Sequence, residues 1–302
     1  GNYDESIEYL QKLDPNNQYS GPIYTFLIGM SYYRKGDPYK AIHYFNNAIE
    51  ICKKINCATW GTLPAWYFWL GRAYYDTENY EKAIENFSIA ADISTENPKP
   101  PYNTSSWKNW FSLIPSKSVC LSWLGYAYYI KGEYQKAIDS LNKSLEFDPK
   151  GSADIFMTLA FSFEKLGNSK EALAAVNRAI ELDPQNAVRY VALGQIQISF
   201  GQKIEAIKSF KKAIELAPNR PEPYQELAKI YLDYEKYEDA INVLKKALEL
   251  DRDNSETLML LSTAYIYSGN FVESYNLLTK IIEKYTIYGI GITIKIDYDG
   301  YP

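Results

Sequence analysis

The chain has 302 residues, of which 46% are hydrophobic and 23% are charged, so its composition supports a buried core and excludes an intrinsically disordered protein. Its net charge of −5 argues against nucleic acid as a partner, because neutralising phosphates requires an excess of lysine and arginine. No apolar run approaches the length of about 18 residues that spans a bilayer, so the sequence predicts a soluble protein without membrane insertion.

A small residue recurs along the chain, most often after leucine. Its positions are Gly29, Gly71, Gly125, Ala160, Gly194, Ala228 and Ser262, at spacings of 42, 54, 35, 34, 34 and 34 residues. In most copies an aromatic residue follows after three positions, a second small residue after twelve, a bulky apolar residue after sixteen and an alanine after nineteen. These offsets place apolar side chains on one face of each of two consecutive helices, which we call the first and the second helix of a repeat.

The period and the order of small, aromatic, alanine, bulky and alanine residues, closed by Pro149, Pro184 and Pro218, resemble the tetratricopeptide repeat (TPR) family. The resemblance implies an all-α fold, a helix-turn-helix solenoid with the form of a right-handed superhelix. A single helix pair cannot bury its apolar face, whereas a stack of pairs can. The recurring tyrosines occupy packing offsets, so we interpret most of the 29 tyrosines as structural.

In chain order the pattern divides the sequence into five parts. They are the second helix of a partial repeat at 1–18, repeats one and two at 22–97 with an insertion at 56–63, an inserted loop rich in proline and tryptophan at 98–117, repeats three to seven at 118–286, and a strand-like tail at 287–302. In the inserted loop, Trp107, Trp110 and Phe111 have the spacing of one helical face. We favour the interpretation that these aromatic residues cover a gap in the stack; the alternative is contact with a partner.

The tail changes from helical periodicity to strict alternation. Ile292, Ile294, Ile296 and Tyr298 alternate with polar residues, which predicts a short β-type segment. Gly289-Ile290-Gly291-Ile292 resembles the loop that opens a PDZ domain, which implies a longer parent protein; a plain C-terminal tail is the alternative.

The chain lacks an initiator methionine and a signal-like segment, so we expect a processed or excised piece. The compartment stays open, with the cytoplasm slightly favoured over a bacterial envelope.

In the TPR family the first helices line a concave groove that binds peptides. Carried over by position, the resemblance implies a partner-binding groove with an aromatic N-terminal half and a polar C-terminal half. Its implied residues are Phe26, Met30, Tyr33, Phe68, Arg72, Tyr75, Tyr126, Tyr129, Met157, Phe161, Gln195, Gln225, Lys229 and Thr263. The Lys-Asn-Asn-Lys-Arg clamp of family members that grip acidic chaperone C-termini is absent, because Phe26, Met30, Ser122 and Tyr126 occupy corresponding sites.

Enzymatic chemistry finds no support in the sequence. Three cysteines are too few for a disulfide scaffold, although Cys52 and Cys57 could pair, and the single histidine, His43, disfavours a histidine-based metal or catalytic site. The sequence contains no phosphate-binding loop and no nucleophile elbow. We therefore predict a non-enzymatic protein without a cofactor or metal.

These observations favour a protein–protein interaction scaffold that binds a peptide or a partner segment in its groove. Two other functions remain open. The chain could be the regulatory or substrate-recruiting arm of a larger enzyme, such as a PDZ-containing protease, or it could assemble with itself into a homo-oligomer through exposed end faces.

Overall fold

The computed structural model describes residues 2–13, 21–55, 62–94 and 114–287. These ranges contain fifteen α-helices and no strand, which confirms the all-α helical repeat. The predicted β-type tail beyond Ile287 lies outside the described residues, so neither the strand nor the PDZ resemblance gains support.

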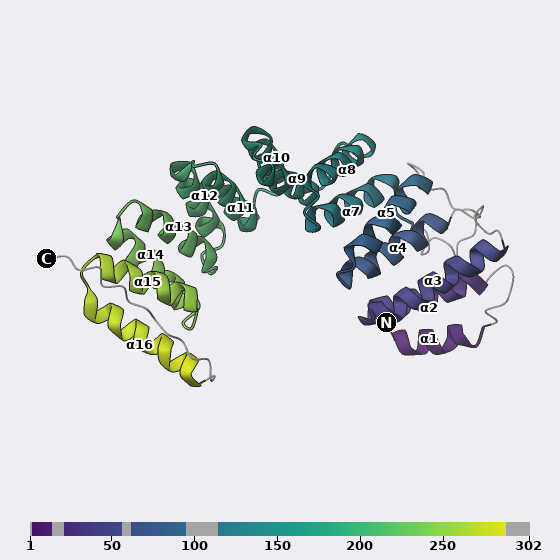
Figure 1. Ribbon diagram of the computed structural model, residues 1–302, viewed down its shortest axis with the longest axis horizontal. Helices are drawn as coiled ribbons and strands as arrows, with labels where there is room; N and C mark the ends of the chain where they lie inside the picture. The colour runs from purple at the N-terminus through teal and green to yellow at the C-terminus, as the bar shows by residue number, and fades with distance from the viewer. Residues whose placement is uncertain (1, 14–20, 56–61, 95–113, 288–302) are drawn as a thin grey trace. The chain divides into compact units, whose positions relative to one another are not determined.

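The helices follow one another in pairs along the chain (Figure 1). Their bounds are α1 (Tyr3–Gln11), α2 (Gly21–Lys35), α3 (Pro38–Ile55), α4 (Leu63–Asp76), α5 (Tyr80–Ile93), α7 (Lys117–Ile130), α8 (Tyr134–Phe147), α9 (Ala153–Lys165), α10 (Ser169–Leu182), α11 (Ala187–Ser199), α12 (Lys203–Leu216), α13 (Glu222–Asp233), α14 (Tyr237–Leu250), α15 (Ser255–Tyr267) and α16 (Phe271–Ile287). No helix among the described residues is long and apolar enough to cross a bilayer.

The chain forms two compact units, residues 1–179 (unit 1) and residues 180–302 (unit 2). In unit 1, α3 packs on its own first helix, α2, and on the following first helix, α4; α5 does the same with α4 and α7. In unit 2, α12 packs on α11 and α13, and α14 packs on α13 and α15. Each of these four second helices therefore fills the space between two first helices, as stacking of repeats requires.

The two helices of a repeat cross at the recurring small residue. A Cβ atom added to Gly29 would lie 2.7 Å from the Phe45 ring, and one added to Gly194 would lie 2.6 Å from the Phe210 ring. Both phenylalanines are fully buried. The larger ring therefore requires the smaller residue opposite, which explains why the two positions vary together along the sequence.

The turn between the two helices of a repeat has one left-handed residue. Gly36 has φ of +89°, and Glu78 and Glu235 occupy the same repeat position with φ of 60° and 56°. The turn closes by backbone hydrogen bonds such as Lys236 N–H to Tyr231 O at 2.8 Å. Because a Cβ atom is disfavoured at positive φ, the two glutamates strain turns that glycine would adopt freely.

We expect Glu235→Gly to stabilise the α13–α14 pair by about 1 kcal/mol, because it removes the left-handed penalty. Hydrogen exchange of the α13 and α14 amides measures the change. The matched control is Glu238→Gly, inside α14 and also exposed, which should destabilise the same pair by about 0.5–1 kcal/mol. A loss of protection in Glu235→Gly would contradict the strain at this turn.

The two units have chemically different cores. In unit 1, the Phe26 ring packs at 5.1 Å from Phe45 and at 5.7 Å from Trp66, whereas the main clusters of unit 2 are largely aliphatic.

Cys52 is disulfide-bonded, and Cys57 lies outside the described residues. Cys120 is a free thiol, and burial raises its pKa to about 11. At neutral pH this thiol stays protonated, which makes it a poor nucleophile.

Candidate functional site

A stripe of partly exposed aromatic side chains crosses four first helices of unit 1. Its members come from α2, α4, α7 and α9, and we call them, together with one arginine of α4, the aromatic stripe. They are Tyr33, Trp69, Arg72, Tyr75, Trp123, Tyr126, Tyr129 and Phe161. In the first helices, positions three, four or seven apart share a face, so residues such as Trp69 and Arg72 of α4 line up.

The rings of the stripe contact one another from helix to helix. Tyr33 meets Trp69 edge to face with 5.5 Å between ring centroids, and Tyr75 meets Trp123 in the same way at 5.6 Å. Tyr129 of α7 lies 6.4 Å from Phe161 of α9. Such ring pairs contribute about 0.5–1.5 kcal/mol each beyond the area they bury. The stripe is therefore pre-ordered, and a ligand on it would find side chains that are already fixed.

Arg72 lies at the centre of the stripe and interacts with the Tyr33 hydroxyl. Its guanidinium carbon Cζ lies 3.6 Å from the centroid of the Trp123 ring, which is the distance of a stacked cation–π contact. Its Nε atom is buried and has no hydrogen-bond partner among the described residues. A buried donor without a partner lowers stability by about 1–3 kcal/mol.

The Tyr33 hydroxyl stands beside Arg72 and donates a hydrogen bond to the Asp76 carboxylate. Burial and this hydrogen bond raise the pKa of Tyr33 to about 12, although the nearby Arg72 opposes the rise. Burial likewise raises the pKa of Tyr126 to about 12. Both hydroxyls are therefore neutral at physiological pH, and Arg72 is the cationic member of the stripe.

Six of the residues implied by the family resemblance meet in the stripe, namely Tyr33, Arg72, Tyr75, Tyr126, Tyr129 and Phe161. Met157 is partly exposed on α9. Three others need correction, because Phe26, Met30 and Phe68 are 0%, 3% and 4% exposed and belong to the core of unit 1. Phe26 packs on Phe45 of its own repeat and on Trp66 of the next first helix, and Phe68 packs on Phe87 of its own repeat, so these side chains present almost no surface to a partner.

Sequence reasoning missed Trp69 and Trp123, which form the middle of the stripe. Both stand two residues before the recurring glycine, in Trp69-Leu70-Gly71 and Trp123-Leu124-Gly125. This repeated Trp-Leu-Gly triplet was the available signal. The triplet alone does not say whether its tryptophan is exposed or buried, because a side chain at the same offset could equally point into the stack.

In unit 2, the first-helix positions implied by the family resemblance are polar, and the charged residue among them is already paired. Lys229 lies between Glu226 at 3.2 Å and Glu256 at 2.8 Å, so it offers no free cation. Gln225 is only 5% exposed and donates to Asn254 and Thr257, which makes it a packing residue. Gln195 and Thr263 are exposed.

Two further expectations concern other places. The loop residues Trp107, Trp110 and Phe111 lie outside the described residues. Within the described ranges, no group of three or more histidine, cysteine, aspartate or glutamate residues could hold a metal ion.

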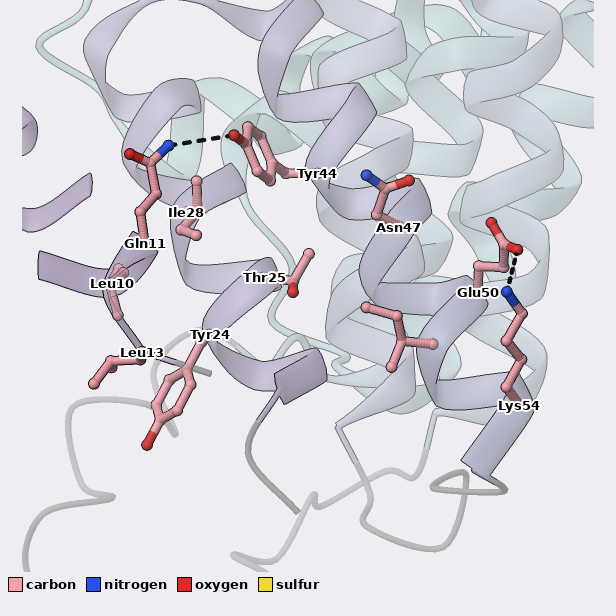
Figure 2. Close-up of a pocket in the computed structure, with 11 residues that line it drawn as sticks. Leu10, Gln11, Leu13, Tyr24, Thr25, Ile28, Tyr44, Asn47, Glu50 and Lys54 are labelled. Atoms are coloured by element: carbon pink, nitrogen blue, oxygen red, sulfur yellow. Dashed lines mark hydrogen bonds and ion pairs between the residues drawn. The ribbon is translucent and has the colours of Figure 1, made fainter. Parts of the chain in front are cut away.

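A separate pocket of about 330 Å³ lies against α1, α2 and α3 (Figure 2). Leu10, Ile28 and Ile51 make its apolar part, while Gln11 donates to the Tyr44 hydroxyl at 3.4 Å. The pocket shares no residue with the aromatic stripe.

Comparison with known proteins agrees with the observed helix pairs. Models described as tetratricopeptide repeat match residues 22–96, 118–150, 153–186, 187–220 and 231–286. A search of curated proteins finds no match.

Among solved structures, the C-terminal part of a TPR repeat-containing protein from Cytophaga hutchinsonii has a TM-score of 0.62 at 18% identity, covering 86% of this chain and 95% of its own. The MamA protein has a TM-score of 0.51 at 21% identity, covering 59% of this chain and 98% of its own. YrrB, described as a TPR protein with an unusual peptide-binding site, has a TM-score of 0.48 at 21% identity, covering 64% of this chain and 89% of its own. At these identities the similarities show the fold alone.

Proposed function

Because the chain belongs to the tetratricopeptide repeat family, whose members are generally protein-interaction scaffolds, we propose that it binds a peptide segment of a partner protein along the aromatic stripe of unit 1. The segment carries bulky apolar or aromatic side chains and one carboxylate. The observation that carries this proposal is the Arg72 guanidinium stacked on Trp123 among partly exposed rings.

The rings supply contact area at a low entropic cost, because the ring pairs of the stripe already hold them in place. Tyrosine, tryptophan and arginine are also the residues that dominate binding energy at protein interfaces. An apolar side chain of the partner would pack against the partly exposed rings of Tyr129 and Phe161.

The arginine selects the charge of the ligand. Its planar guanidinium offers a fork of donors that matches a carboxylate, and a charge-assisted hydrogen bond is about twice as strong as a neutral one. The partly exposed guanidinium of Arg72 would gain a charged acceptor when a carboxylate binds. In unit 2, by contrast, a carboxylate near Lys229 would have to displace Glu226 or Glu256.

The test is selection of binders from a displayed library of random peptides on the full chain. Affinities of the enriched peptides are then measured by fluorescence anisotropy. We expect sequences that combine aromatic or aliphatic residues with aspartate or glutamate. The variant Tyr129→Ser/Phe161→Ser should bind them at least about tenfold more weakly, because it removes two partly exposed ring contacts.

The matched control is Gln195→Ala/Thr263→Ala, which changes two exposed first-helix residues of unit 2 and should leave affinity unchanged. Circular dichroism checks that both variants keep their helices. Peptides that bind the Tyr129→Ser/Phe161→Ser variant as tightly as the wild type would discard the stripe as the binding surface.

A further inference from the structure

Arg72 and Asp76 lie four residues apart on α4, a spacing at which oppositely charged side chains of a helix ordinarily meet. Within the described residues, each instead contacts a different first helix. The Arg72 guanidinium lies on the Trp123 ring of α7, with 3.6 Å between its Cζ and the ring centroid. The Asp76 carboxylate accepts a hydrogen bond from the Tyr33 hydroxyl of α2. One turn of α4 therefore carries an arginine and an aspartate that are held by different neighbours.

The same arrangement of charges occurs in one other repeat. Lys229 and Asp233 of α13 occupy the two corresponding repeat positions. Asp233 pairs with Lys203 of α12 at 2.8 Å, and two glutamates hold Lys229 at 3.2 and 2.8 Å. There too the aspartate is held by a different helix, but carboxylates of the protein already occupy the cation, whereas the Arg72 guanidinium keeps an aromatic ring as its neighbour.

We propose that Tyr33 is a positioning residue, whose hydroxyl holds the Asp76 carboxylate and thereby keeps Arg72 on the Trp123 ring, available to an acidic ligand. This inference rests on the function proposed above and identifies what sets its charge selectivity. Arg72 is the only cation of α4, so it is the cation that Asp76 meets on its own helix once the hydroxyl is removed. An ion pair between these two residues would then compete with the carboxylate of the ligand for one guanidinium.

The charge environment sets the size of this competition. Asp76 is exposed, and the arginine precedes the aspartate, which is the less favourable order of an ion pair along a helix. Because Asp76 ends α4, the helix dipole disfavours its negative charge, and the hydrogen bond from Tyr33 offsets this effect. We therefore expect loss of the hydroxyl to weaken an acidic ligand by roughly two- to fivefold, the range for an exposed ion pair.

The first experiment needs no ligand. Protons of the Arg72 side chain above the Trp123 ring are shifted upfield by its ring current, and NMR of the full chain with labelled arginine measures this shift. We expect Tyr33→Phe to reduce the upfield shift and Tyr33→Phe/Asp76→Asn to restore it. An unchanged shift in Tyr33→Phe would overturn the proposal. A reduction that persists in the double variant would also overturn it, because the hydroxyl would then act on Arg72 without Asp76.

The second experiment is a double-mutant cycle, read by fluorescence anisotropy with a selected peptide that contains one glutamate. Tyr33→Phe should weaken binding by roughly two- to fivefold beside Asp76 and change almost nothing in the Asp76→Asn protein. The effect should also disappear when glutamine replaces the glutamate of the peptide. The matched control is Tyr74→Phe on α4, which removes a hydroxyl that accepts a hydrogen bond from Asn46 at 3.4 Å and should leave affinity unchanged.

The cycle separates failure of this inference from failure of the proposed function. An equal loss from Tyr33→Phe in both backgrounds, or no loss beside Asp76, would refute the positioning role while leaving the stripe as the binding surface. Failure of the proposed function would show as peptides that bind the Tyr129→Ser/Phe161→Ser variant as tightly as the wild type. In that case the NMR experiment still decides whether the Tyr33 hydroxyl keeps Asp76 from Arg72.

Discussion

Gly194→Ala is expected to lower the free energy of unfolding of the α11–α12 pair by about 1–3 kcal/mol, the range for overpacked cores. The added Cβ would lie 2.6, 2.7 and 3.0 Å from three atoms of the Phe210 ring, which is fully buried and cannot move aside. The complementary change, Phe210→Ala, should destabilise the pair by about 3–5 kcal/mol, because it leaves a cavity where the ring was.

The chain supplies its own rescue for this overpacking. Where the small position is alanine, the facing residue is smaller than phenylalanine, as in Ala228 with Leu244 and Ala160 with Val176. Phe210→Leu combined with Gly194→Ala should therefore be more stable than the sum of the single changes predicts, by about 0.5–3 kcal/mol of coupling.

Hydrogen exchange of the α11 and α12 amides measures these effects locally, which suits a repeat array better than one global transition. Gln195→Ala changes an exposed neighbour on the same helix and should stay within about 0.5 kcal/mol of the wild type. Strict additivity of the Gly194 and Phe210 changes would mean that the two residues do not compete for the same space.

The second large effect concerns Arg72. For a selected peptide that contains one glutamate, Arg72→Gln should weaken binding by roughly 10- to 100-fold, since a hydrogen bond to a charged group contributes about 1.5–3 kcal/mol. Arg72→Lys should restore little of this affinity, because an ammonium group has neither the planar fork nor the stacking surface that meets the Trp123 ring at 3.6 Å.

A double-mutant cycle attributes the effect to the carboxylate. Replacing the glutamate of the peptide by glutamine should weaken binding to the wild type, and it should change almost nothing for the Arg72→Gln protein. Lys229→Gln is the control, because that lysine is already paired with two carboxylates of unit 2. Equal losses in both proteins would show that the glutamate is recognised elsewhere, while leaving the rings of the stripe as the binding surface.

The repeat itself could be predicted from the sequence, because its signal lies in spacing. Helix pairs, the crossing at Gly29 or Gly194 and the left-handed turn at Gly36 all follow from local rules of periodicity, size and backbone freedom. The same rules say less about Glu78 and Glu235, since their left-handed conformation is imposed by the helices on either side.

Which first-helix residues face a partner could not be predicted in the same way. Phe26 and Phe68 have the offset of surface residues, yet both are buried against the rings of neighbouring helices. Trp69 and Trp123, which position-by-position comparison with the family overlooked, carry the middle of the stripe instead. The difference comes from volume, because large rings on adjacent helices compete for one interior space and only their packing settles which are left outside.

The spacing of small, aromatic and bulky residues along this chain was enough to specify a helical repeat, its family and its expected role as a scaffold. The aromatic stripe and the stacking of Arg72 on Trp123 became visible only with the folded helices. Helical periodicity depends on neighbours within about four residues, whereas exposure and charge pairing depend on side chains that are distant in the sequence and meet only after the repeats stack.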